Sequence, residues 1–246
     1  MRRIGAALLS LAAFLAAWKL ATVVGGYPEF ILPAPEAVLA EAGDAIASGV
    51  LWEHTAATLL EAVLGFVVGA TAAVAIGVVL GKSLLVERVL SPYLVAAQAV
   101  PILALAPLLH IWFGGGLLAR VVICALIVFF PIAIATMVGI RSTDPLLAEL
   151  LRSLGARPSQ RIRLLEIPSA LPVLFGGLRV GITLAVIGAV VAEWAGASVG
   201  LGVLINIANQ GLFNTPLMFV ALAVLAIIGL AFHGLVVLVE RRLVSH

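Results

Sequence analysis

Residues 141–168 read RSTDPLLAELLRSLGARPSQRIRLLEIP, and this polar, arginine-rich stretch interrupts a strongly apolar chain. An apolar run over 117–140 precedes it and another over 169–192 follows it, and each is long enough to cross a membrane as a helix. A connection of this length between two helices is longer than a plain connector needs. The sequence therefore predicts a structured element between two membrane spans.

The order of turn-forming residues predicts the shape of this element. Asp144, followed by proline, is typical of a helix N-cap, and it favours a short helix over 145–154. Gly155 ends that helix, because glycine tolerates the left-handed backbone found after a helix C-terminus. Pro158 suits the first turn of a second short helix, and we expect Pro168 to close it before the next span. The prediction is a helix-turn-helix elbow.

The composition places the rest of the chain in lipid. Of the 246 residues, 63% are apolar and 11% are charged, and the mean hydropathy is +1.25, whereas soluble domains average roughly 45–50% apolar and about 25% charged. A soluble globule is excluded. The net charge of +2 is too small to indicate a basic surface for nucleic-acid binding. The one cysteine, Cys124, excludes a disulfide framework and a cysteine-based zinc site.

Six apolar runs are long enough to span a bilayer, and their continuity favours helices over a barrel. A signal peptide is the alternative for the first run, because Met1, Arg2 and Arg3 precede it, but no small-residue cleavage site ends it. The predicted spans are approximately Ile4–Val24, Ala62–Gly81, Val89–Phe113, Leu117–Ile140, Ser169–Ala192 and Leu217–Val239.

The distribution of basic residues predicts that both termini are cytoplasmic. In that orientation 11 of the 14 Lys and Arg residues lie in cytoplasmic segments, as the positive-inside rule requires. The outer segment 25–61 has six acidic residues and no basic one. The elbow is then cytoplasmic, with Arg152, Arg157, Arg161 and Arg163 interleaved with leucines and Ile162. Such a surface suits a partner's groove, although a basic loop that only fixes topology is the alternative.

Small residues at every fourth position predict close helix contacts in the second and fifth runs. They serve either as a fixed scaffold or as a surface along which helices slide. The second run carries Gly65, Gly69, Ala73, Gly77 and Gly81, and the fifth carries Gly177, Gly181 and Ala185. Pro101, Pro107 and Pro131 are expected to kink the third and fourth runs, either as tolerated bends or as part of a gate.

No assembled catalytic or metal site is indicated, and the chain is not expected to be an enzyme. The segment from Gly77 to Ser83 resembles a phosphate-binding loop, but it has one residue too few and lacks the first glycine. The four histidines have no metal-ligand spacing. ATP is therefore expected to bind another subunit.

Several polar or amphipathic residues near the membrane interior are candidates to line a solute path, although polar contacts between helices are an equal alternative. A mid-membrane arginine usually faces protein or water, so Arg179 either joins the path or reaches the interface. The lack of a cation cluster mildly favours an uncharged organic solute. The path candidates are Gln98, Pro101, Trp112, Thr136, Arg179, Asn206, Asn209 and Gln210.

The elbow resembles a known family signature. Glu149, Gly155 and Pro168 are spaced by six and thirteen residues, as in the cytoplasmic motif of permease subunits from binding-protein-dependent ATP-binding-cassette (ABC) importers. The motif reads Glu-Ala-Ala, three residues, Gly, nine residues, Ile-x-Leu-Pro, and this chain has leucines at both alanines. Segments such as QAVPILALAPLLHIWFG and GLRVGITLAVIGAVVAEWAG resemble the branch that serves nitrate, taurine, alkanesulfonates, pyrimidine precursors and riboflavin.

This resemblance implies an all-α, six-span permease of the type I importer fold in a prokaryotic inner membrane, with residues 1–30 as first span and start of the outer loop and 31–246 as the permease core. It implies a homodimer, two ATPase subunits that bind ATP and Mg²⁺, and an extracytoplasmic solute-binding protein. The elbow would be the element that couples to the ATPase. The coupling residues implied are Glu149, Arg152, Gly155, Ala156, Arg157, Gln160, Arg161, Ile162 and Pro168.

Two other classes of protein remain open. An ion-coupled carrier would act without an ATPase, but it normally needs ion ligands in mid-membrane, and the six runs have no acidic residue near their centres. A membrane-embedded enzyme would need an acid, base or metal set, which the sequence does not assemble. Among solutes, riboflavin or a pyrimidine precursor is favoured over a sulfonate or nitrate.

Overall fold

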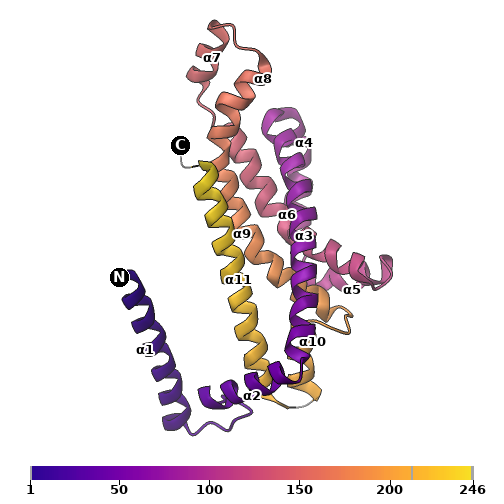
Figure 1. Cartoon of the computed structure of the whole chain (residues 1–246). Helices are drawn as coiled ribbons and strands as arrows, with labels where there is room; N and C mark the ends of the chain where they lie inside the picture. The colour runs from indigo at the N-terminus through magenta and orange to yellow at the C-terminus, as the bar shows by residue number, and fades with distance from the viewer. Residues whose placement is uncertain (1, 212, 245–246) are drawn as a thin grey trace. The chain divides into compact units, whose positions relative to one another are not determined.

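The computed structural model describes residues 2–211 and 213–244, and this part of the chain is helical with no strand (Figure 1). Met1, on which the signal-peptide alternative partly rests, lies outside the described residues. The helices are α1 (Arg2–Gly25), α2 (Pro35–Ala47), α3 (Val50–Lys82), α4 (Leu84–Ala99), α5 (Ile102–Trp112), α6 (Leu117–Arg141), α7 (Pro145–Ser153), α8 (Pro158–Arg161), η1 (Ile162–Glu166), α9 (Ile167–Trp194), α10 (Leu201–Asn206), η2 (Ile207–Gly211) and α11 (Thr215–Val244).

Four helical segments within the described residues are long and apolar enough to cross a membrane: α3, α6, the run Pro158–Trp194 and α11. They contain four of the six predicted spans. The pair α4 and α5 adds a fifth if the two helices are taken as one broken span. The first predicted run is represented by a shorter apolar stretch, Leu9–Gly25 of α1.

The third predicted span is not one kinked helix. Helices α4 and α5 are bent by 95° at a break between Ala99 and Ile102. The cause is Pro101, because a proline disfavours helical backbone in the residue before it. Val100 is accordingly extended, with φ −78° and ψ 121°. Pro107 and Pro131 lie inside helices that continue past them.

The prediction that Pro168 closes a separate short helix is wrong. The helical backbone runs without a gap from Pro158 to Trp194, through the π-helical segment η1. Pro168 lies inside this continuous run, where a proline removes one backbone hydrogen bond and its ring crowds the preceding turn. Just before it, the Ile167 amide donates to the Ile162 carbonyl five residues back. This wider turn lets the elbow's second helix continue into the span.

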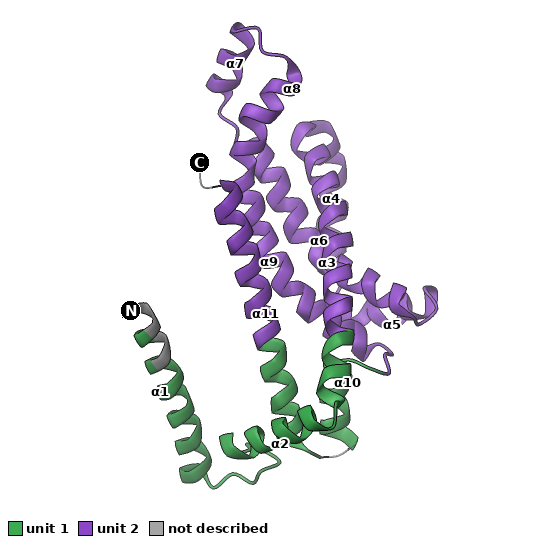
Figure 2. Cartoon of the chain, in the orientation of Figure 1, with its two compact units in different colours: residues 1–57, 199–226 green, residues 58–198, 227–246 purple. Residues whose placement is uncertain are grey.

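The chain forms two compact units, residues 1–57 with 199–226 and residues 58–198 with 227–246 (Figure 2). In the first unit, Trp18 of α1 donates from Nε1 to the Pro33 carbonyl at 3.1 Å and stacks on Phe219 of α11. Lys19 forms an ion pair with Glu36 of α2, and this hydrogen bond lowers the pKa of Glu36. These contacts connect α1, α2 and the start of α11.

The core of the second unit is α6, which packs between α3 and α9. Cys124, Val128 and Ile132 of α6 are fully buried, together with alanines of the two neighbouring helices. Glycines on those neighbours let the backbones approach closely. A Cβ placed on Gly181 of α9 would lie 2.5 Å from Ile132 Cδ1 of α6. The same interface also has a glycine on α6, because a Cβ on Gly139 would lie 2.9 Å from the Ala170 carbonyl of α9.

The small-residue stripe of α3 faces α6 along its length. A Cβ on Gly69 would lie 2.6 Å from the Ala125 carbonyl oxygen, and one on Gly77 would lie 2.6 Å from Thr136 Cβ. At the far end of the stripe, Gly81 meets Ile140, and Ala73 is fully buried. Within lipid, this close packing replaces the hydrophobic effect as the force that joins helices.

The Gly69→Ala variant tests this interface, because the added methyl group would meet backbone that cannot rotate away. Overpacking of this kind costs about 1–3 kcal/mol, so we expect a lower thermal midpoint of the purified protein, measured by fluorescence-detected gel filtration after heating. Gly229→Ala in α11 is the control, since nothing lies within 4 Å of its added Cβ. Equal midpoints for the two variants would contradict close packing of α3 on α6.

Candidate coupling elbow and buried polar site

The elbow begins with α7, whose two ends are fixed by local hydrogen bonds. Asp144 Oδ1 accepts from the Leu146 amide at 2.8 Å, so the sequence-predicted N-cap is formed. At the other end, Gly155 has φ +74°. Its amide donates to the Arg152 carbonyl at 3.0 Å, and the Ala156 amide donates to the Leu151 carbonyl at 2.9 Å. This paired pattern is the Schellman motif, which needs a left-handed residue at the glycine position.

The second part of the elbow starts with α8. The Arg157 amide donates to the Gln160 side-chain oxygen at 2.7 Å, and Pro158 occupies the first turn. From there η1 leads directly into α9, so the elbow has a rigid connection to a membrane span. Ile162 begins η1 and is half-buried, whereas Pro168 is exposed.

One face of α7 is apolar and has no cover from its own chain. Leu146, Leu150 and Leu154 are 73%, 52% and 72% exposed. A helix turns by about 100° per residue, so these leucines form one stripe, while Ala148 and Arg152 lie on the opposite face. Glu149 is exposed beside the stripe. Exposed apolar surface of this kind is typical of sites that contact another protein or a membrane.

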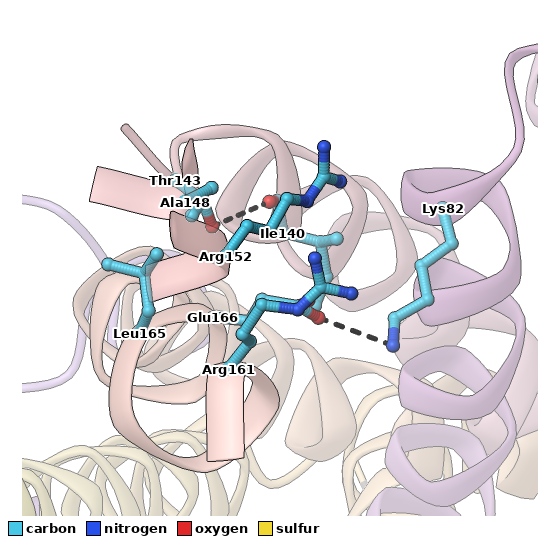
Figure 3. Close-up of a pocket in the computed structure, with 8 residues that line it drawn as sticks. All are labelled: Lys82, Ile140, Thr143, Ala148, Arg152, Arg161, Leu165 and Glu166. Carbon is cyan, nitrogen blue, oxygen red and sulfur yellow. Dashed lines mark hydrogen bonds and ion pairs between the residues drawn. The ribbon is translucent and has the colours of Figure 1, made fainter. Parts of the chain in front are cut away.

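The opposite face of α7 lies over a cavity of about 380 Å³ at the base of the elbow (Figure 3). The cavity brings three cations together from α3, α7 and α8. Lys82 Nζ lies 3.3 Å from Glu166 Oε2, whereas Arg152 and Arg161 make no ion pair within the described residues. The lining residues are Lys82, Ile140, Thr143, Ala148, Arg152, Arg161, Leu165 and Glu166.

The path candidates come from separate parts of the fold. Gln98, Pro101 and Trp112 are exposed on the bent pair α4 and α5. In the other unit, Asn206 ends α10, and Asn209 lies exposed in η2 beside Gln210.

Two further candidates are occupied by contacts within the second unit. Thr136 is 3% exposed against Gly77, and its hydroxyl donates to the Ile132 carbonyl, so it lies inside a helix interface. The Arg179 guanidinium lies 2.9 Å from Glu240 of α11.

A buried polar cluster, absent from the sequence candidates, lies in α3, α6 and α9. Glu61 of α3 is 1% exposed, and Arg120 of α6 donates to its Oε1 at 2.5 Å. One turn earlier, the Thr58 hydroxyl donates to Glu193 Oε1 of α9 at 2.6 Å. The sequence interpretation placed both acids in outer loops. The unbroken stretch without Gly or Pro from 50 to 64 is the signal that could have extended α3 to include Glu61.

Residues 65–245 match the family described as binding-protein-dependent transport system inner membrane component. The chain belongs to this family. The permease is 48% identical over 236 residues to the riboflavin transport system permease protein RibX of Chloroflexus aurantiacus, covering 96% of this chain and 88% of the relative. It is 35% identical to the putative aliphatic sulfonates transport permease protein SsuC of Bacillus subtilis, covering 97% of this chain and 86% of the relative.

Among solved structures, the permease matches the MetNI methionine ABC transporter in an inward-facing conformation. The TM-score is 0.64 at 23% identity, over 80% of this chain and 95% of that one. The likeness shows the fold of type I ABC importer permeases. The all-α fold class, the family and the inner-membrane location expected from the sequence are confirmed.

The buried ion pair gives a prediction about stability. Arg120→Met leaves Glu61 buried without its partner, and breaking such a pair costs about 3–5 kcal/mol. We expect a large fall in the thermal midpoint of the purified permease, and the double variant Glu61→Gln with Arg120→Met should recover part of it. Lys19→Met, which breaks an exposed pair, should leave the midpoint unchanged. A double variant as unstable as Arg120→Met alone would show that the two residues are not coupled.

Proposed function

We propose that two copies of this permease enclose one path through the inner membrane, and that two separate ATPase subunits drive it by gripping the α7 elbow. An extracytoplasmic binding protein delivers the solute. The observation that carries the proposal is the uncovered leucine stripe of α7, held on a left-handed turn at Gly155 in a chain of this family. The residues proposed to couple are those of the elbow signature named from the sequence.

The structure of the second unit supports a route for the coupling. A displacement of α7 reaches α9 through the continuous helical run Pro158–Trp194. Helix α9 in turn packs on α6 with glycine at the contacts. ATP favours one conformation only if it binds that state better, so delivery of solute must reciprocally favour the ATP-bound state.

The permease itself is proposed to be non-catalytic. Gly77 and Gly81, part of the segment that resembles a phosphate-binding loop, are helical in α3 and packed against α6. Helical backbone amides are already hydrogen-bonded to carbonyls, so they are not free to cradle a phosphate. ATP and Mg²⁺ are therefore assigned to the partner ATPase, and no cofactor is assigned to this chain.

The solute is proposed to be a neutral heterocycle, with riboflavin first and a pyrimidine precursor second. The 48% identity to RibX supports this order. An aliphatic sulfonate is the alternative that the similarity to SsuC supports. Path-lining roles are proposed for Gln98, Pro101 and Trp112 near the bend, and for Asn206 and Asn209 at the end of α10.

The topology is proposed to have six spans with both termini in the cytoplasm. Helix α1, within residues 1–30, is the first span, and the bent pair α4 and α5 is the third. Residues 31–246 form the permease core with the elbow at 141–168. In this arrangement the segment from α2 to the start of α3 lies outside, where its acidic residues are compatible with the positive-inside rule.

Substitutions at Gly155 test the coupling role of the elbow. Nothing lies within 4 Å of an added Cβ, so the cost of Gly155→Val is backbone strain alone, on the order of 1–3 kcal/mol. We expect reduced co-purification with the ATPase and reduced uptake at unchanged membrane insertion. Gly155→Asn should retain both, because Asn tolerates left-handed backbone. If the Val and Asn variants bind the ATPase equally well, the turn has no coupling role.

Reconstitution tests the motor and the solute together. The permease, its ATPase and the neighbouring binding protein are placed in proteoliposomes, and labelled riboflavin uptake is measured with an alkanesulfonate as competitor. We expect uptake that needs ATP and the ATPase and that an excess of sulfonate does not reduce. Uptake that persists with an inactive ATPase but collapses with the proton gradient would identify an ion-coupled carrier instead.

A further inference from the structure

We propose that the cavity at the base of the elbow binds a phosphate group, and that Arg152, Arg161 and Lys82 hold it. Figure 3 shows the three side chains around the cavity, which is also lined by Ile140, Ala148 and Leu165. The ligand chemistry is a phosphate oxyanion, either on an anionic lipid of the cytoplasmic leaflet or as a free phosphate. This site is separate from the proposed solute path and from the leucine stripe.

The charge balance of the cavity favours an anion. Its lining holds three cations and one carboxylate, Glu166, which lies 3.3 Å from Lys82. The other two cations have no carboxylate partner among the residues that the structure describes. The Nε of Arg161 is also buried and makes no hydrogen bond within the described part. Guanidinium groups placed together in this way suit the geometry of phosphate.

The size and position of the cavity suit the same ligand. A volume of about 380 Å³ is ample for a phosphate group and part of its substituent. Lys82 is the last residue of α3, and Ile140 lies in the last turn of α6. The distribution of basic residues predicts that both of these helix ends are cytoplasmic. Lipid phosphates lie at this boundary, and basic pockets between spanning helices on that side bind lipid head groups.

In this proposal the two faces of α7 bind different ligands, a protein at the leucine stripe and a phosphate group at the cavity. The leucine stripe points away from Ala148 and Arg152, so a protein bound to the stripe does not need to enter the cavity. Arg157 and Arg163 belong to the same basic segment but do not line the cavity. This distinction separates a phosphate site from a general attraction of the basic elbow for anions, and it supplies a matched pair of variants.

The test measures phosphate binding by the full permease in a neutral detergent without its ATPase. The probes are dioctanoyl phosphatidic acid, inorganic phosphate and dioctanoylglycerol, which has the same tails but no phosphate. Binding is followed as a dose-dependent rise in thermal midpoint. We expect binding of the phosphatidic acid, of inorganic phosphate or of both, and none of dioctanoylglycerol. Binding of the lipid alone assigns the site to a head group, and binding of inorganic phosphate alone assigns it to the free anion.

The variants decide whether the cavity is the site. Arg152→Gln with Arg161→Gln should weaken phosphate binding by about tenfold or more, because two charge-assisted contacts are lost. Arg157→Gln with Arg163→Gln removes the same charge and should bind as the unaltered protein does. Lys82→Gln leaves the elbow residues in place and should also weaken binding, so the result does not depend on one variant folding.

Three outcomes would overturn the proposal. The first is the absence of phosphate binding by the unaltered permease. The second is an equal loss in the two double variants, which would show diffuse charge attraction. The third is undiminished phosphate binding in Arg152→Gln with Arg161→Gln, which would show that the phosphate binds outside the cavity. None of these results bears on ATP-driven uptake, so this inference and the proposed function fail separately.

Discussion

Close approach of helix backbones at the glycines of α3 and α9 is the constraint on which the second unit depends. In lipid, the hydrophobic effect does not drive helices together, because the lipid tails are as apolar as the side chains. Dispersion contacts over short distances must therefore hold the helices together. Gly69 and Gly181 permit those distances between α6 and each of its two neighbours. The buried pair between Glu61 and Arg120 depends on the same geometry, because a side chain in mid-helix finds its partner only where α3 and α6 already touch.

The elements with strong local signals could be predicted from the sequence. Asp144, Pro145 and Gly155 specify α7 and its turn through short-range hydrogen bonds, and these need no tertiary partner. The apolar runs identify the spans because lipid demands continuous apolar helices. Two errors of the sequence interpretation concern proline. At Pro101 the chain breaks with a 95° bend, whereas at Pro168 the helix continues. The difference depends on whether the preceding backbone can change its hydrogen-bond register, and residue spacing alone does not reveal that.

The buried polar groups could not be predicted, because their environment is created by packing. Glu61 reads as the last residue of an acidic outer segment until α3 is seen to start at Val50. The cavity cations likewise come from three elements that are far apart in sequence. Arg152 and Arg161 share a polar loop with Arg157 and Arg163, and only the fold shows that the first pair lines the cavity and the second does not. The sequence thus identified the elbow as a distinctive element and did not show that its two faces have different neighbours.

The π-helical segment η1 determines the direction in which the elbow points around the axis of α9. Each π turn holds one residue more than an α turn, so everything before Ile162 is rotated about the α9 axis by about 100° relative to an uninterrupted α-helix. The direction in which the leucines point around α9 therefore depends on five residues, Ile162–Glu166. In a relative with a different number of residues in this helical turn, the same elbow sequence would point in a different direction around α9. Under the proposed function, an insertion or deletion in this one turn would change the direction in which the elbow meets its ATPase.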